Sequence, residues 1–226
     1  MSVAGVSRRE RSRRLPRPVR ERQILDGATS VFARRGYHAA SMDEISEAAG
    51  ISKPMIYAYL GAKEELFAAC VRHAMDRMTE LIEQAVTPVA SPEQRLWRGL
   101  LAFFAFVDED RDGWNVLHRH AGAHGEPSVP VAAEWRQQMI DLVARLLAEA
   151  ADATGVTEGA TADVQAMAVG LVGAAESLAD WWQHHPERTA STLATWLMNL
   201  VWLGFGRLVT GQVWRAEPET VHPVED

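Results

Sequence analysis

The sequence contains a single cysteine, Cys70, and no apolar run that approaches the length of a membrane span. One thiol cannot form an internal disulfide, so we expect a reducing compartment. A transmembrane helix needs about 20 uncharged residues in succession. The basic N-terminus is not followed by an apolar core or a small-residue cleavage site, which argues against a secretory signal. These absences predict a cytoplasmic protein without membrane contact.

Lysine is also scarce, because among 23 basic residues only Lys53 and Lys63 are lysines. The chain has a net charge of −7, yet residues 1–63 hold 12 Lys and Arg against 6 Asp and Glu, while residues 64–226 hold 11 against 24. A basic head on an acidic body predicts that only the head meets an anionic polymer. Both lysines lie in this head, and a compact ammonium is a good ligand for backbone phosphates.

Sequence signatures of the common enzyme classes are missing as well. There is no P-loop, dinucleotide fingerprint, nucleophile elbow or H-E-x-x-H motif. Four candidate metal ligands match no recognised zinc spacing: His118, His120, His124 and Glu126. Glu176 and Asp180, one helical turn apart, fit a catalytic carboxylate pair, a polar anchor in a ligand pocket, or an ion pair at a dimer edge. We expect no enzyme, no metal and no cofactor; an all-α enzyme using His118, His120 and Glu176 is the alternative.

Apolar residues recur at three- and four-residue spacing, and no segment alternates convincingly with period two. The pattern predicts an all-α fold of about nine helices. Gly36 should end the first helix (17–35), a Ser41–Glu44 capping box should open the second, and Ser52 should cap the third. Later helices are expected at about 92–108, 112–121, 130–153, 162–184 and 189–211. The predicted organisation is a disordered basic arm (1–16), a head (17–63), a helical body (64–216) and a flexible tail (217–226).

Residues 41–60, SMDEISEAAGISKPMIYAYL, form a helix-turn-helix pattern of two short helices separated by a glycine turn. Ile45, Ala49 and Ile51 should pack the two helices at a steep angle, and Gly50 supplies a turn conformation that other residues resist. The exposed side of the second helix then faces a DNA major groove. The head is therefore predicted to be a DNA-binding domain.

The run ASMDEISEAAGISKPMIYAYLGAKEELF resembles the DNA-binding domain of the TetR (tetracycline repressor) family of one-component regulators. The shared features are a capped second helix, an A-A-G-[IV]-S-K turn, an aromatic recognition helix and a K-E-x-L-F start to the fourth helix. With the preceding helix the resemblance covers about residues 20–75. Two departures, Ser46 where Ala is usual and Leu60 where Phe is more frequent, lie on the packing side.

The resemblance implies DNA contacts for eight residues. Ser41, Lys63 and Tyr57 are expected to bind backbone phosphates, the first two at helix N-termini. The surface that reads bases is expected to comprise Ser52, Lys53, Pro54, Met55 and Tyr59. Helix packing is the alternative role for Tyr57 and Tyr59. For the arginine-rich arm, DNA contact and a solvated tail are equally compatible with the sequence.

Beyond Val86 the sequence carries no motif of its own, and the resemblance implies a body that binds a small-molecule effector and forms a homodimer. The resemblance implies that the last two long helices, here the segments 162–184 and 189–211, form the dimer interface. The second segment is apolar over more than half its circumference, so it needs partners on two sides. Burial within one subunit is the alternative. A symmetric dimer would place two recognition helices about 34–36 Å apart on a pseudo-palindromic operator in double-stranded DNA.

Large aromatic and methionine side chains lie on the helices that would line a cavity in the TetR family, and they are candidates for lining an apolar pocket here. The predicted ligand-binding residues are Phe103, Phe104, Trp114, Trp135 and Met139, with Glu176 as a polar anchor; ordinary core packing is the alternative for each. The chain is thus predicted to be a sequence-specific transcriptional repressor that a small apolar ligand releases from DNA. A DNA-binding regulator without a small-molecule effector is the alternative.

Overall fold

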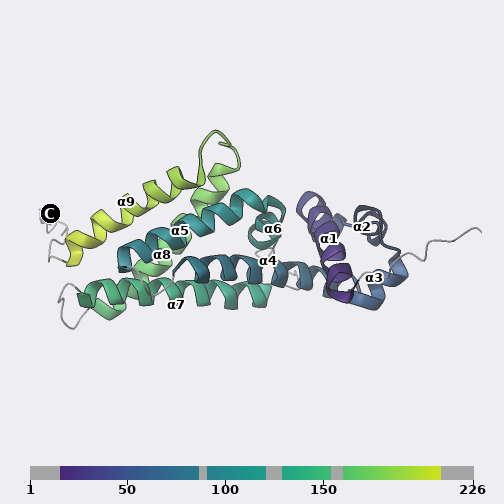
Figure 1. Cartoon of the computed structure of the whole chain (residues 1–226), viewed down its shortest axis with the longest axis horizontal. Coiled ribbons are helices and arrows are strands. Elements are labelled where there is room, and N and C mark those ends of the chain that lie inside the picture. The colour runs from purple at the N-terminus through teal and green to yellow at the C-terminus, as the bar shows by residue number, and fades with distance from the viewer. Residues whose placement is uncertain (1–15, 87–90, 121–128, 154–159, 210–226) are drawn as a thin grey trace, which may run out of the picture.

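The computed structural model describes residues 16–86, 91–120, 129–153 and 160–209 (Figure 1). The predicted arm and tail lie outside these residues apart from Pro16, as do His124 and Glu126 and the side chain of His120. The described residues form helices and no strand, which confirms the all-α prediction. No helix in the described ranges combines the length and the apolar character that crossing a membrane requires.

The described residues contain nine α-helices and one π-helical turn, η1. In chain order they are α1 (Arg17–Ala39), α2 (Met42–Ala49), α3 (Lys53–Leu60), α4 (Lys63–Ala85), α5 (Pro92–Glu109), α6 (Arg111–Asn115), η1 (Val116–His120), α7 (Val129–Ala153), α8 (Ala160–Trp182) and α9 (Ala190–Val209). Almost every boundary lies within two residues of its expected position. The exceptions are α1, which continues to Ala39 beyond a kink at Gly36, and the predicted segment 112–121, which divides into an α-helical and a π-helical turn.

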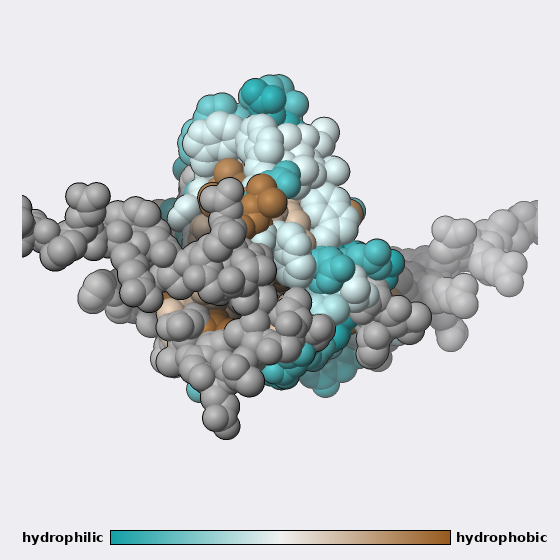
Figure 2. Space-filling view, turned by 90° about the vertical axis from the view of Figure 1, so that its left-hand side faces the viewer, coloured by the Kyte–Doolittle hydropathy of each residue, from teal (hydrophilic) through white to brown (hydrophobic). Residues whose placement is uncertain are grey.

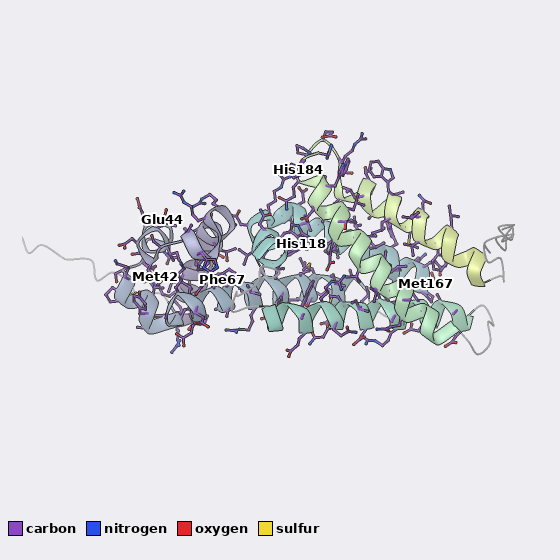
Figure 3. The ribbon with its side chains drawn as sticks, turned by 180° about the vertical axis from the view of Figure 1, so that it is seen from behind. Met42, Glu44, Phe67, His118, Met167 and His184 are labelled. Atoms are coloured by element: carbon purple, nitrogen blue, oxygen red, sulfur yellow. The ribbon has the colours of Figure 1, made fainter. Side chains whose placement is uncertain are left out.

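The helices form two groups along one axis. Figure 1 shows α1, α2 and α3 gathered at one end of the molecule as a head, while α5 to α9 form the body at the other. The long helix α4 begins in the head and continues into the body, where it lies beside α5 and α7. Helix α6 and the π-helical turn contact α1, so the head also touches the body away from α4. The view from behind places His118 at this junction (Figure 3).

The head begins and ends its helices where the sequence predicts. Gly36 has φ 75° and ψ 165°, so the regular part of α1 ends at Arg35. The Ser41–Glu44 capping box is present: the Ser41 hydroxyl accepts the Glu44 backbone N–H at 3.2 Å, and the Ser41 backbone N–H donates to the Glu44 carboxylate at 3.2 Å. Gly50 is left-handed, with φ 64° and ψ 29°. The cap expected from the Ser52 side chain is wrong, because that hydroxyl makes no capping hydrogen bond.

A continuous apolar core links the head to the body. Ile45, which the pattern placed between the helix-turn-helix helices, is fully buried, as are Ile56 on α3 and Phe67 near the start of α4. Cys70 is fully buried as well, and burial raises the pKa of its thiol to about 12. The thiol therefore stays protonated at neutral pH and fills space in the core.

Candidate nucleic-acid interface and ligand cavity

Helix α3 presents one side to solvent and buries the other. Ile56 has no exposed surface, whereas Met55 is 40% exposed and Tyr57 49% exposed. Ser52 and Pro54 are also exposed. A methionine and a tyrosine with this much exposed surface are not part of the core, so they can contact a partner surface. Four of the residues predicted to contact DNA thus lie on the accessible side of α3.

Lys53 starts α3 and is already paired within the head. Its ammonium lies 2.6 Å from the carboxylate of Asp43 on α2, which is itself 78% exposed. The hydrogen bond that Lys53 donates to Asp43, followed by the negative charge of Asp43, raises the pKa of Lys53 above its ordinary value. Lys53 therefore stays charged at any physiological pH, but its ammonium must leave or share Asp43 to reach a phosphate or a base.

Lys63 and Tyr59 have partners that position them differently. The Lys63 ammonium donates to the backbone carbonyl of His38 at 3.1 Å and lies 4.8 Å from the ring centre of Tyr37. It therefore stands at the N-terminus of α4, where the helix dipole also attracts phosphate. Tyr59 is partly buried and packs against the core, with the Arg17 guanidinium 5.5 Å from its ring centre. The packing role thus describes Tyr59 in this structure better than it describes Tyr57.

Ser41 stands at the N-terminus of α2 inside a small polar cluster. Its partner Glu44 also lies 3.2 Å from the Arg35 guanidinium. The hydrogen bond from the Ser41 backbone, helped by the Ser41 hydroxyl and Arg35, lowers the pKa of Glu44 below its ordinary value. The carboxylate thus accepts hydrogen bonds from donors at the start of α2 and holds Ser41 in place there.

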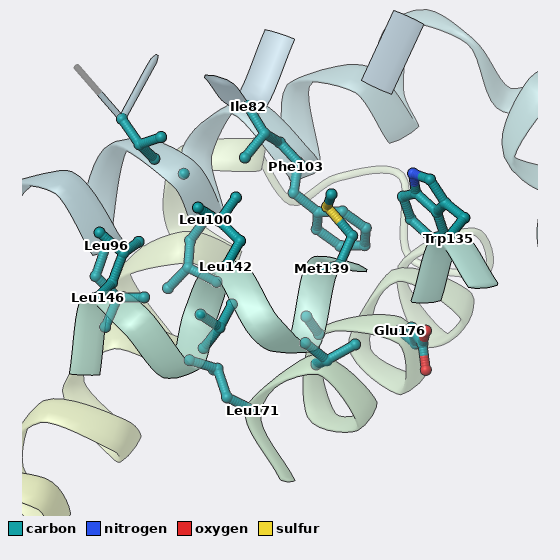
Figure 4. Close-up of a pocket in the computed structure, with 15 residues that line it drawn as sticks. Ile82, Leu96, Leu100, Phe103, Trp135, Met139, Leu142, Leu146, Leu171 and Glu176 are labelled. Atoms are coloured by element: carbon teal, nitrogen blue, oxygen red, sulfur yellow. The ribbon is translucent and has the colours of Figure 1, made fainter. Parts of the chain in front are cut away.

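An apolar cavity of about 620 Å³, counting its opening to solvent, lies between α4, α5, α7 and α8. In Figure 4 a group of leucines, including Leu96 and Leu146, lies on one side of the cavity, and Trp135 and Glu176 lie on the other. The lining residues are Ile82, Val86, Leu96, Gly99, Leu100, Phe103, Trp135, Met139, Leu142, Val143, Leu146, Leu171, Val172, Ala175 and Glu176. Mostly hydrophobic walls are typical of small-molecule sites.

Four of the six residues predicted to bind a ligand line this cavity: Phe103, Trp135, Met139 and Glu176. The other two lie outside it. Phe104 is fully buried and packs edge-on against Trp182, with ring centres 6.1 Å apart. Trp114 is 2% exposed and its indole N–H donates to the Asp180 carboxylate at 3.3 Å. Phe103 lines the cavity and also contacts Trp114 outside it, with the two rings edge-on and their centres 5.4 Å apart.

Sequence reasoning missed the aliphatic part of the wall. Nine of the lining residues are leucine, isoleucine or valine, and these recur with the same spacing as core residues elsewhere in the chain. Periodicity reports that a side chain faces inward, but not whether the space opposite is filled. The prediction relied on aromatic and methionine side chains. It therefore included Phe104 and Trp114, which do not line the cavity, together with residues that do.

The residues of the catalytic and metal hypotheses are held in separate contacts. The Arg136 guanidinium Nε lies 3.0 and 3.1 Å from the two carboxylate oxygens of Glu176. His118 Nε2 lies 2.9 Å from the Asp180 carboxylate, and the His118 ring stacks on Trp114 with centres 4.8 Å apart. Glu176 and Asp180 therefore have different partners. The described residues contain no cluster of three or more potential ligands that could hold a metal ion.

Helices α8 and α9 carry large apolar side chains that remain exposed in the described chain. These are Val169 and Trp181 on α8 and Trp196, Leu200 and Leu203 on α9. Leu200 is 71% exposed, and Leu203 is 65% exposed. Figure 2 looks at the end of the molecule where α9 finishes and shows apolar surface (brown) there among paler atoms. Several large exposed apolar side chains on two neighbouring helices are typical of a protein interface.

The chain matches known families over both of its parts. Residues 24–70 match the family described as "Bacterial regulatory proteins, tetR family", and residues 92–204 match "Tetracyclin repressor-like, C-terminal domain". The chain belongs to the TetR family. A crystal structure of a TetR-like transcriptional regulator from Rhodococcus sp. RHA1 is 39% identical, covers 85% of this chain and 99% of that chain, and superposes with a TM-score of 0.73.

Two further relatives show how the similarity is distributed. The HTH-type transcriptional activator FasR of Mycolicibacterium smegmatis is 40% identical over 114 residues, which are 50% of this chain and 51% of FasR. The match thus spans about half the length of FasR. The regulator FadR from Bacillus subtilis, in complex with stearoyl-CoA, shares the fold with a TM-score of 0.70 and 20% identity, over 80% of this chain and 96% of that chain.

Proposed function

We propose that this chain is a homodimeric, sequence-specific DNA-binding transcription regulator whose operator affinity is changed by a small apolar ligand. The observation that carries the proposal is the exposed side of α3, where Met55 and Tyr57 face solvent on a helix-turn-helix whose other side is fully buried. Such a helix is the element that enters the major groove in this class of DNA-binding domain. A regulator of this kind acts in the cytoplasm, beside the bacterial chromosome.

Dimerisation would occur through α8 and α9. The five exposed apolar side chains on these helices would be buried against the same surface of a second copy. An isologous interface of this kind has two-fold symmetry, which matches the symmetry of a pseudo-palindromic operator. The two α3 helices would then contact successive major-groove turns.

The ligand would occupy the cavity between α4, α5, α7 and α8. Its walls offer hydrocarbon surface, which favours a ligand with an extended apolar portion. The described structure of FadR from Bacillus subtilis holds stearoyl-CoA, a ligand with a long acyl chain. Because α4 both lines the cavity and begins in the head, a ligand that prefers one position of α4 would change the spacing of the two heads.

We propose repression as the direction of control, with release from the operator by the ligand. Activation is the second candidate, because the relative FasR is described as an activator. The two differ in a reporter assay with the operator placed upstream of a promoter: deletion of the regulator raises expression in the first case and lowers it in the second. A regulator without a small-molecule effector would bind DNA identically in the presence of every ligand tested.

The deciding experiment is fluorescence-anisotropy titration of DNA from the regions flanking the chain's own gene, at stepped salt concentrations. Wild-type protein is compared with a Lys53→Ala/Tyr57→Phe double variant. We expect tight, sequence-selective binding that weakens steeply with salt and that the double variant loses, because phosphate contacts release counterions. Equal binding to every DNA, or none, would contradict the proposal.

A further inference from the structure

Arg17, the first residue of α1, lies against the recognition helix α3. Its guanidinium is 5.5 Å from the ring centre of Tyr59, which is within the range of a cation–π contact. Figure 1 shows α1 and α3 together in the head, where the two helices are in contact. The Arg17 side chain is nevertheless 71% exposed. A cationic group therefore lies beside α3 and remains open to solvent.

The Arg17 guanidinium uses one of its nitrogens within the protein. Nε donates to the carboxylate of Glu21, one turn further along α1, at 2.7 Å. Neither terminal nitrogen of Arg17 has a hydrogen-bond partner among the residues that the structure describes. An arginine side chain carries five N–H donors, of which Nε supplies one. Glu21 and the Tyr59 ring thus fix the direction of the side chain and leave its terminal donors available.

The position of Tyr59 places Arg17 at one edge of the exposed side of α3. Tyr57 and Tyr59 are two residues apart, so they point about 200° apart around the helix axis. Ala58 lies between them and is exposed. Tyr57, which is 49% exposed, is therefore at one edge of the solvent-facing side. The partly buried Tyr59 is at the other edge, with the Arg17 guanidinium over its ring.

A helix in the major groove has a phosphate backbone on each side of it. The groove is about 12 Å wide, which leaves little space beside a helix of about 10–12 Å diameter. Groups at the edges of the exposed side then meet phosphates, whereas groups in the middle meet base edges. A guanidinium with free terminal nitrogens is a strong phosphate ligand, because two parallel hydrogen bonds can reach one phosphate. Arg17 therefore has the position and the free donors of a phosphate contact.

We propose that Arg17 binds a backbone phosphate of the operator, and that Tyr59 positions it there instead of making the base contact that the family resemblance implies. This inference rests on the proposed function, because it assumes that α3 enters the major groove. It goes further by adding a residue of α1 to the DNA interface and by giving Tyr59 a positioning role. A phosphate contact carries no sequence information, so Arg17 contributes affinity for every DNA sequence.

The test measures DNA binding of the full-length protein by fluorescence anisotropy at stepped salt concentrations. The probes are a duplex from the regions flanking the chain's own gene and a scrambled duplex of equal length and composition. Arg17→Gln should weaken binding to both duplexes by about fivefold at low salt. It should also reduce the slope of log affinity against log salt by about one, because one fewer phosphate contact releases counterions. The control Arg22→Gln removes the same charge from an exposed position about 140° around α1, and it should have a much smaller effect.

Two substitutions of Tyr59 separate positioning from direct contact. Tyr59→Phe keeps the ring under the guanidinium, so it should bind both duplexes within about twofold of wild type. Tyr59→Leu removes the ring and should lower affinity. In the Arg17→Gln background, however, Tyr59→Leu should cost almost nothing more, because the side chain that the ring positions is already gone. A circular dichroism spectrum of each variant checks that the head is folded.

Arg17→Gln and Tyr59→Phe decide the inference even if Tyr59→Leu does not fold. Wild-type protein that binds both duplexes equally, or neither, would contradict the proposed function and the inference with it. Selective wild-type binding, with Arg17→Gln equal to Arg22→Gln in affinity and salt slope, would overturn the inference and leave the proposed function standing. A loss confined to the flanking duplex would make Arg17 a base contact, and a large loss in Tyr59→Phe would make the tyrosine hydroxyl a direct contact. Either result would also overturn the inference.

Discussion

The ammonium of Lys53 and the carboxylate of Asp43 lie 2.6 Å apart across the turn of the helix-turn-helix. A residue expected to contact DNA is therefore held, before DNA arrives, by an acidic neighbour on the preceding helix. The pair orients the lysine at the start of α3, and it also competes with DNA for the ammonium. Asp43 also adds a negative charge to a surface that must approach phosphates. It therefore opposes DNA binding both by pairing with Lys53 and by repelling phosphates.

Replacing Asp43 by Asn should therefore tighten operator binding. The substitution keeps the shape of the side chain but removes its charge. Lys53 then reaches a DNA phosphate without first giving up its ion pair with Asp43. We expect the affinity to rise about threefold at low salt, the scale of an exposed ion pair, and the gain to shrink as salt screens it. Anisotropy titrations across salt concentrations measure this. Asp76→Asn, the same change at an exposed position on α4, should have a smaller effect; a loss of affinity in Asp43→Asn would show that the pair mainly orients Lys53.

The capping box makes the head's stability depend on pH. The lowered pKa of Glu44 means that its contribution is fully present above about pH 4.5 and is lost as the pH falls through the lower, folded-state value. Glu44→Gln should therefore unfold at lower urea concentration than wild type at neutral pH, and the difference should disappear in acid. Urea unfolding at several pH values tests this. Ser41→Ala, which removes the cap hydroxyl, should cost about 1 kcal/mol.

Gly27 should tolerate no side chain, although it lies in the middle of α1. A Cβ atom built there would come within 2.7 Å of the Cα and backbone N of Ala49, where α1 crosses the end of α2. We expect Gly27→Ala to lower the free energy of unfolding by about 1–3 kcal/mol, since neither backbone can move freely. Chemical denaturation gives the value. Arg22→Ala, on the exposed side of the same helix, should stay within about 0.5 kcal/mol of wild type.

Filling the cavity should stabilise the protein and block its ligand. Ala175 lines the cavity, so Ala175→Leu places added methyl groups in empty space and should raise the free energy of unfolding by about 0.5–2 kcal/mol. Ala168, on the same helix, is fully buried and does not line the cavity. Ala168→Leu should instead destabilise by about 1–3 kcal/mol. Thermal unfolding of both variants beside wild type would distinguish stabilisation by Ala175→Leu from destabilisation by Ala168→Leu. Similar effects from both substitutions would argue against a usable cavity.

A charge on the exposed face of α9 should break the dimer. Leu200→Glu would place a carboxylate in the apolar interface that we propose, and we expect the dimer to dissociate about a hundredfold more readily. Light scattering coupled to size-exclusion chromatography measures the oligomeric state. Gln138→Glu, an exposed change on α7, is the matched control. A dimer that survives Leu200→Glu would place the interface elsewhere.

Local signals in the sequence were sufficient for the helices. The capping box at Ser41, the glycines at 36 and 50 and the apolar spacing around Ile45 act over a few residues, and each appears in the structure where expected. The helix-turn-helix could also be located, because its packing depends on residues close together in the chain.

Long-range relationships could not be predicted in the same way. The Lys53–Asp43 pair depends on the angle between α2 and α3, and the contact of Gly27 with Ala49 depends on how closely α1 crosses α2. Phe103 and Phe104 are adjacent in sequence, yet one lines the cavity and the other packs against Trp182. Adjacent positions on a helix point about 100° apart, so the assignment needs the positions of neighbouring helices.

Helix α4 runs without a break from Lys63 in the head to Ala85 in the body. Its continuity has a consequence for protein engineering. In a chimera joined within α4, each residue inserted or deleted at the junction would rotate the head by about 100° and shift it by about 1.5 Å relative to the body. Exchange of heads between such regulators should therefore succeed only when the helical phase of α4 is preserved, even if both halves fold well.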